Sequence, residues 1–340
     1  MISRSRPWQA QLIATAKFPP RYFLESLAVR KDNSLLISAM NHRELWYVPP
    51  WNGTDLSDPL LLYTFPQLTM GITEGSDDVF YLLLSNIYSS HESHLLRINL
   101  VDWKPGFPIA PEPVLTFPTT VRGLNGCCML AADVLLAADC FGSRIWRVDL
   151  AADGCEGEAS VWAHHESMAH LPDGPMPDQP GVNGIKYSAK TGHIYYTSTA
   201  QRLFMRVAVE PGAWAVAGEP EVVATGMMGD DFWIDEEREL AYVTTHRQNT
   251  VDLVSLDPTR NDGGSRTSVV GDPFTDMLIG PTNGCWGRLP GESGRVAYVL
   301  TDGGTKTAPL DGIAREAAVV RMDLGRNVLV EFCVDHLRKT

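Results

Sequence analysis

The 340-residue sequence lacks long apolar runs, since no stretch approaches the ~18 consecutive apolar residues that a membrane helix needs. It also lacks a basic run, and its formal net charge is −13. We therefore expect no membrane span and no nucleic-acid partner. The motifs G-x-S-x-G, G-x-x-x-x-G-K-[ST] and G-x-G-x-x-G are absent, which disfavours an α/β-hydrolase and a nucleotide site. We expect no organic cofactor.

Cysteine occurs six times but never as C-x-x-C, which disfavours a zinc site. Most of the cysteines lie in apolar segments and are predicted to be buried thiols. The N-terminal segment has early arginines but no apolar stretch long enough for a secretory signal. We therefore expect either a cytoplasmic protein or a mature form whose signal has been removed. Nothing in the sequence predicts the oligomeric state.

A repeated pattern occupies most of the chain. Six segments align on one residue at the start of a short strand. We call these six residues the anchors: Glu25, Met70, Asn125, Asn183, Asp230 and Asn283. Successive anchors are 45, 55, 58, 47 and 53 residues apart. Each is followed by a turn, a β-rich strand, a third strand and a weaker fourth one. About four strands per ~50 residues, repeated six times, predict an all-β, six-bladed β-propeller with four-stranded blades.

The ends of the repeat indicate how the ring closes. The N-terminal segment "QLIATAKFPP" looks like a fourth strand moved to the front of the chain, so we expect it to join the sixth sheet. The C-terminal "VLVEFCV" is the competing candidate. Residues 1–340 are expected to form a single domain, because no Pro/Gly/Ser linker interrupts the period. Two smaller stacked domains are the alternative.

The anchors are predicted to surround one mouth of the central channel, which the first strand of each blade lines. Two of them carry a carboxylate and three carry an amide. Oxygen atoms of these groups, converging from separate strands, suit a hard divalent cation such as Ca2+. The alternative is structural, since Asn-Gly and Asp are ordinary turn residues.

Three segments, "LESLAV", "VNGIKYS" and "GDDFWID", resemble the E-G-P, P-N-G-L and P-D-G-hydrophobic-x-D elements of the senescence marker protein/gluconolactonase family. That family has six-bladed propellers with one divalent ion at the channel mouth. The resemblance implies that Glu25, Asn183 and Asp230 are ion ligands. It also implies that Asn125 is a ligand or substrate contact, and that Asp230 acts as a base in a lactonase.

The chain departs from that pattern in ways that suggest a bulkier, more apolar mouth. Asp231 replaces a glycine, and the Met70 anchor is not polar. Cys128, Trp233 and Trp286 each follow an anchor by three positions, so we expect them at the mouth. The alternative for the two tryptophans is packing between blades. The segments "FLESLAVR", "GVNGIKYS", "DDFWID" and "TNGCWGR" resemble the fungal hetero-Diels–Alderases that join a tropolone quinone methide to a humulene-type terpene alcohol.

Loops between second and third strands should lie at the same mouth as the anchors. From these loops we predict His246, Arg247 and Gln201 as catalytic donors that polarise a carbonyl. The predicted substrate contacts are Met70, Asn125, Cys128, Phe141, Trp233, Asn283, Trp286 and His42. The long segment 301–318 is a candidate lid.

Three functions are compatible with this sequence, all with a hydrophobic small-molecule ligand. The first prediction is a non-hydrolytic [4+2] cycloaddition in natural-product biosynthesis. The alternative is a metal-dependent lactonase or ester hydrolase. The third possibility is a binding propeller without chemistry. The apolar residues near the anchors favour the first, and the Glu/Asn/Asp set favours the second.

Overall fold

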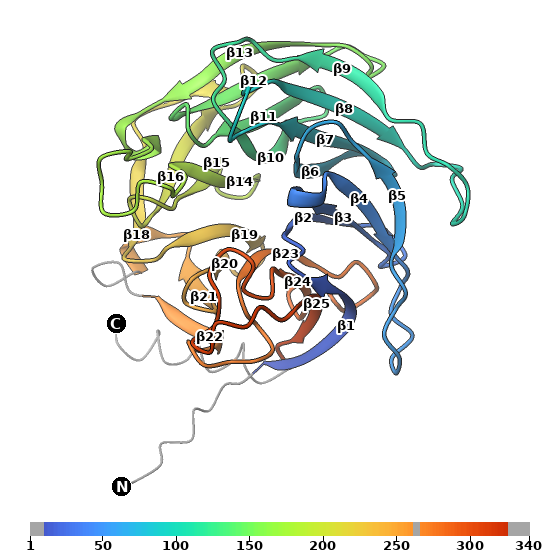
Figure 1. Ribbon diagram of the computed structural model, residues 1–340. Helices are drawn as coiled ribbons and strands as arrows, with labels where there is room; N and C mark the ends of the chain where they lie inside the picture. The colour runs from blue at the N-terminus through green and yellow to red at the C-terminus, as the bar shows by residue number, and fades with distance from the viewer. Residues whose placement is uncertain (1–9, 261–265, 326–340) are drawn as a thin grey trace, which may run out of the picture.

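The computed structural model describes residues 10–260 and 266–325, which form six antiparallel sheets around a central axis (Figure 1). The first three blades, from the axis outward, are β2 (Leu24–Val29), β3 (Leu35–Ala39), β4 (Glu44–Val48) and β5 (Leu60–Thr64); β6 (Thr69–Ser76), β7 (Val79–Ser85), β8 (Ser93–Asn99) and β9 (Glu112–Thr116); and β10 (Leu124–Ala131), β11 (Val134–Asp139), β12 (Arg144–Leu150) and β13 (Gly157–His164). The last three are β14 (Val182–Ser188), β15 (His193–Ser198), β16 (Leu203–Glu210) and β18 (Glu221–Thr225); β19 (Gly229–Asp235), β20 (Leu240–Thr245), β21 (Thr250–Ser255) and β22 (Thr267–Gly271); and β23 (Pro281–Trp286), β24 (Val296–Thr301), β25 (Glu316–Asp323) and β1 (Gln11–Pro20).

The predicted six-bladed, four-stranded propeller is confirmed, and so is its closure by the N-terminal strand. β1 pairs antiparallel with β25 and forms the outer edge of the sixth blade. The competing segment "VLVEFCV" lies outside the described residues. A short strand that the sequence did not predict, β17 (Ala215–Val216), pairs with the end of β16.

Helix is almost absent from the described part of the chain. It is limited to three 3-10 turns, Met40–His42, Glu166–Met168 and Pro258–Arg260. No helix there has the length and apolar character needed to cross a membrane.

Each anchor lies at an irregularity in its strand. In all six blades, the pairing of the first strand with the second shifts at the anchor, as between Leu24 and Ser26 in blade 1 and between Gly229 and Phe232 in blade 5. The shift inserts one extra residue into the inner strand. A bulge of this kind re-aims a side chain, so four of the six anchors turn into the channel mouth described below.

The apolar core lies between neighbouring blades. One cluster joins Cys128 and Leu136 of blade 3 to Ile185 and Tyr196 of blade 4. The second strands are buried along their length except at His193, the first residue of β15, because both faces of each inner sheet are covered. This accounts for the continuous apolar runs in the sequence.

The described cysteines are free thiols, as the sequence predicted. Three of them are buried and two are partly exposed: Cys127, Cys128 and Cys140 in the first group, and Cys155 and Cys285 in the second. Cys333 lies outside the described residues.

Candidate functional site

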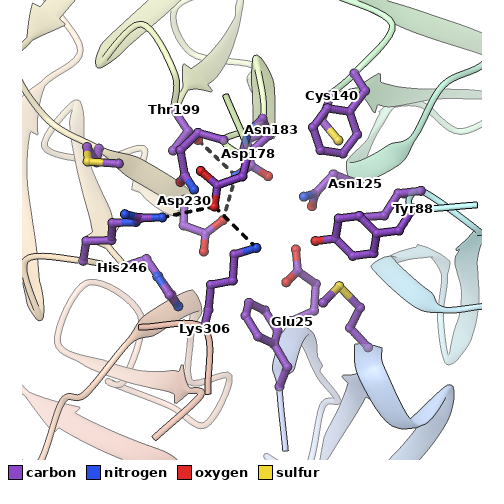
Figure 2. A pocket seen from close by; sticks show the side chains of 18 residues that line it. Glu25, Tyr88, Asn125, Cys140, Asp178, Asn183, Thr199, Asp230, His246 and Lys306 are labelled. Atoms are coloured by element: carbon purple, nitrogen blue, oxygen red, sulfur yellow. Dashed lines mark hydrogen bonds and ion pairs between the residues drawn. The ribbon is translucent and has the colours of Figure 1, made fainter. Parts of the chain in front are cut away.

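Four of the six anchors line one pocket at one mouth of the channel. We call this pocket the front pocket and this mouth the front mouth. Glu25, Asn125, Asn183 and Asp230 line it from blades 1, 3, 4 and 5 (Figure 2). They are the same four residues that the gluconolactonase resemblance singled out. Because the bulges turn the side chains inward, four separate strands place carboxylate and amide groups around one space.

Within residues 10–260 and 266–325, the two carboxylates of this set form no ion pair with a basic side chain. The cations of the pocket pair with other acids, since His246 contacts Asp302 and Arg247 contacts Asp178. Burial raises the pKa of Glu25 to about 8, assisted by the charges of Asp231 and Asp302 and opposed by a hydrogen bond with Asn125.

The pKa of Asp230 is shifted in the same direction as that of Glu25. Burial raises its pKa well above the ordinary value, and the neighbouring charge of Glu25 raises it further. His246 and a hydrogen bond from Asn183 act in the opposite direction. The Asn183 Nδ2 atom lies 2.7 Å from Asp230 Oδ1 and 3.1 Å from Thr199 Oγ1, so the carboxylate is held in a fixed orientation.

These groups fit a divalent cation. Oxygen donors are what Ca2+ prefers, and two carboxylates that disfavour each other's charge are stabilised by a cation between them. Two of the four donors are amides. Accordingly, the described residues contain no cluster of three or more His, Cys, Asp or Glu side chains suited to a metal. Glu25, Asn183 and Asp230 would hold the ion, with Asn125 beside it.

A histidine–aspartate pair stands next to the carboxylates. His246 Nε2 lies 3.1 Å from Asp302 Oδ2, and Asp302 is fully buried. Asp302 also accepts hydrogen bonds from the backbone N–H groups of Gly304 and Lys306, at 2.7 and 2.8 Å. Burial alone would lower the pKa of His246, but Asp302 and Asp230 raise it above the ordinary value. The two carboxylates therefore stabilise the imidazolium form relative to that of a free histidine.

Gly280 allows this pair to form. Its φ of +62° is a conformation that glycine adopts without penalty. A Cβ atom at this position would overlap Asp302 Oδ1 and would press against His246 Nε2. The absence of a Cβ atom at this position therefore leaves room for Asp302 to contact His246.

The wall of the pocket is mainly apolar and its rim is charged. Its enclosed volume is about 70 Å3. The wall is formed by Phe23, Met40, Ile87, Tyr88, Cys140, Phe141 and Met228. Of the residues predicted from the loops, Phe141, His246 and Arg247 line the pocket. Lys306, in the segment predicted to be a lid, also lines it.

Cys128, Trp233 and Trp286 are not in this pocket, contrary to our expectation. They line a second cavity at the opposite mouth. Three residues along a strand correspond to about 10 Å, which takes these side chains to the far end of the channel. Trp286 Nε1 donates to Ile234 O at 2.8 Å, and the two tryptophan rings pack edge to face at 5.9 Å. Packing between blades 5 and 6 is thus the arrangement observed.

Three other predicted contacts, Met70, Asn283 and His42, also lie outside the front pocket. Met70 is fully buried in a core cluster, and Asn283 donates to Asp231 and Ser26 inside the channel. His42 stacks on Tyr22 at 3.8 Å, and Met40 of the same turn occupies the pocket instead.

Gln201 is directed away from the pocket. Its Nε2 donates to Glu166 O and Ala169 O, at 2.7 and 3.2 Å, so it serves to hold a neighbouring loop.

Sequence reasoning missed Asp302, Tyr88, Asp178 and the contact made by Lys306. A signal existed for Asp302, because an aspartate also stands at the end of the second strand of blade 3, where Asp139 is the last residue of β11 ("LLAAD" and "VLTD"). Asp139 also accepts backbone N–H groups, among them Gly123 at 2.8 Å. The other three residues lie on irregular loops that carry no repeat.

No protein-family model matches this chain, and no curated protein matches its sequence. Solved structures do resemble it. A luciferin-regenerating enzyme has a TM-score of 0.64 at 15% identity, over 94% of this chain and 96% of that one. A gluconolactonase from Xanthomonas campestris has a TM-score of 0.62 at 13% identity, over 93% and 90%. A calcium-binding regucalcin from Agrobacterium tumefaciens has a TM-score of 0.57 at 15% identity, over 92% and 96%.

At these identities the likeness establishes a shared propeller fold. None of the three structures is described as a Diels–Alderase. That resemblance therefore rests on sequence segments alone.

Proposed function

We propose that this protein is a divalent-cation-dependent hydrolase of lactones or esters that have a hydrophobic acyl part. The observation that carries the proposal is the pair of buried, mutually unfavourable carboxylates, Glu25 and Asp230, in one pocket with Asn125 and Asn183. The fold likeness to a gluconolactonase and to a calcium-binding regucalcin supports it. This choice reverses the order favoured by the sequence, because the tryptophans that favoured cycloaddition lie elsewhere.

The chain's own residues supply the proton transfers. Asp230 is oriented by Asn183 and would accept a proton from the attacking water as its oxygen bonds to the carbonyl carbon. His246, held by Asp302, would give its proton to the leaving oxygen as the C–O bond breaks. The proton on Asp230 then returns to His246 through solvent. A bound cation would polarise the carbonyl oxygen and stabilise its developing negative charge.

The direct test is hydrolysis of a panel of neutral aryl and alkyl lactones and esters with added Ca2+, Mn2+ or Zn2+. We expect turnover that a chelator abolishes and that the cation restores. Asp230→Asn, which keeps the shape but removes the base, should reduce kcat by at least about 100-fold. Phe107→Ala, an exposed residue outside the pocket, is the matched control. The proposal fails if no substrate turns over, or if Asp230→Asn retains the wild-type rate.

A [4+2] cycloaddition is the second candidate, because the pocket wall is apolar and His246 lines the pocket, where its ring N–H would donate to a carbonyl. Holding two partners together would by itself lower a bimolecular barrier by several kcal/mol. This reaction needs no base, so Asp230→Asn would leave most of the rate in an assay with a quinone methide and an alkene. A chelator would have little effect on it. Hydrolysis and cycloaddition therefore give opposite results with one variant.

A further inference from the structure

Three loops meet at the rim of the front pocket through a shared carboxylate. Arg247, after β20, and Lys306, after β24, approach Asp178, which lies between β13 and β14. The distances to Asp178 Oδ2 are 3.4 Å from Arg247 Nη2 and 3.7 Å from Lys306 Nζ. Figure 2 shows Lys306 directed toward Asp178. Two cations thus converge on a single carboxylate oxygen.

The charge of this rim is not balanced. Among the described residues, Asp178 is the one ion-pair partner found for either cation, so the group retains one positive charge. Lys306 additionally lies over the ring of Tyr88, with Nζ 5.8 Å from the ring centre. The floor of the same pocket carries Glu25 and Asp230. The pocket therefore has a positive rim, an apolar wall and a floor of two carboxyl groups.

Asp178 is held by the two ion pairs and by a hydrogen bond with Gln179. Its side chain is 53% exposed, and both ion pairs are long. The next residue, Gln179, is buried, and its carbonyl lies 2.8 Å from His170 Nδ1, so the loop is anchored beside Asp178. A competing carboxylate could thus replace the Asp178 side chain without unfolding the loop.

The small size of the pocket favours such a replacement. Small-molecule pockets commonly have a volume of about 300–1,000 Å3, whereas the volume of this one is about 70 Å3. A ligand that reaches the floor passes the rim and competes with Asp178 for contact with Arg247 and Lys306. A ligand with its own carboxylate would restore the contacts that Arg247 and Lys306 lose.

We propose that Arg247 and Lys306 bind a carboxylate on the substrate in place of Asp178. The substrates are then hydrophobic lactones or esters that bear a carboxylate at the end remote from the reacting carbonyl. Asp178 is then an internal competitor for the two cations. The identity of the reaction rests on the proposed function, but the carboxylate clamp is a matter of binding and is tested separately.

The test compares two probes of similar shape, 4-phenylbutanoate and 4-phenylbutan-1-ol, in calorimetric titrations with and without Ca2+. We expect the acid to bind at least about tenfold more tightly than the alcohol in both conditions. Lys306→Met should weaken acid binding by about tenfold. Asp178→Asn should strengthen it, because the internal competitor loses its charge.

Lys190→Met is the matched control, because it removes the same charge from an exposed lysine that pairs with Glu239 outside the pocket. Equal affinities for the acid and the alcohol would overturn the inference. So would an effect of Lys306→Met no larger than that of Lys190→Met. Charge-selective binding without any lactone turnover would uphold the clamp and reject the proposed reaction. Turnover of neutral lactones without charge selectivity would uphold the proposed reaction and reject the clamp.

Discussion

Lys186 extends from β14 to Asp231 in the next blade, and its Nζ lies 2.7 and 2.9 Å from the two carboxylate oxygens. Asp231 also accepts a hydrogen bond from Asn283 Nδ2 at 2.5 Å, and it is 7% exposed. The adjacent acids Asp230 and Asp231 therefore have separate partners. Asp230 faces the front pocket, whereas Asp231 pairs with a lysine that lines the second cavity, at the opposite mouth.

Lys186→Met should lower the free energy of unfolding by about 3 kcal/mol, because it leaves Asp231 as a buried charge without a cation. Urea denaturation measures this. The double variant Lys186→Met/Asp231→Asn should recover much of the loss, since the unpaired charge is gone. A single variant as stable as the wild type would show that the pair contributes little.

The stability of the protein without bound cations should depend on pH through Glu25. Its pKa is about 8 in the folded state against an ordinary 4.5, so the folded state binds this proton more tightly than the unfolded chain. The resulting stability is complete below pH 4.5 and is lost as pH rises to about 8. Between pH 5.5 and 8.5 the loss should be roughly 3 kcal/mol. Asp230 acts in the same direction.

Thermal unfolding in the presence of a chelator checks this prediction. Glu25→Gln should flatten the dependence, because the amide does not titrate. Added Ca2+ should raise Tm most at the alkaline end. A Tm that increases from pH 5.5 to 8.5 in the chelator would contradict the account.

Asp302→Asn should lower the pKa of His246, because the variant removes the charge that favours the imidazolium. The imidazolium is the proton donor in the proposed hydrolysis, so the fall in activity at alkaline pH should begin at lower pH. An NMR titration of the His246 ring gives the pKa directly. Asp178→Asn is the control, since its carboxylate contacts Arg247 instead. An unchanged His246 pKa in Asp302→Asn would exclude this positioning role.

Trp233→Ala should cost about 3–5 kcal/mol of stability through the cavity it leaves between blades 5 and 6. Its ring stacks on Tyr242 at 5.5 Å and lies far from the front pocket. Activity per folded molecule should change by less than about twofold. A large loss of kcat with unchanged stability would instead return Trp233 to the substrate site.

The fold was predictable from the sequence because each blade repeats the same order of strands. The anchor spacing identified six blades, and the position of "QLIATAKFPP" identified the closing strand. The repeat did not predict β17, because Ala215 and Val216 form an additional pairing within an irregular connection.

The candidate site was predictable only where it follows the repeat. Glu25, Asn125, Asn183 and Asp230 occupy equivalent bulges and therefore meet. Met70 and Asn283 occupy the same bulge in their own blades, yet one is in the core and the other pairs within the channel. Side-chain chemistry and neighbours, which vary from blade to blade, decide these directions.

The most direct measurement of the central claim is a calorimetric titration of the chelator-treated protein with Ca2+ and Mn2+ at pH 8. The account predicts one ion per chain in the wild type. It also predicts affinity at least about 100-fold weaker in Glu25→Gln and in Asp230→Asn, because each loses one of the two carboxylates. Asp178→Asn should bind the ion with wild-type affinity. No binding by the wild type, or equal binding by Asp230→Asn, would contradict the account.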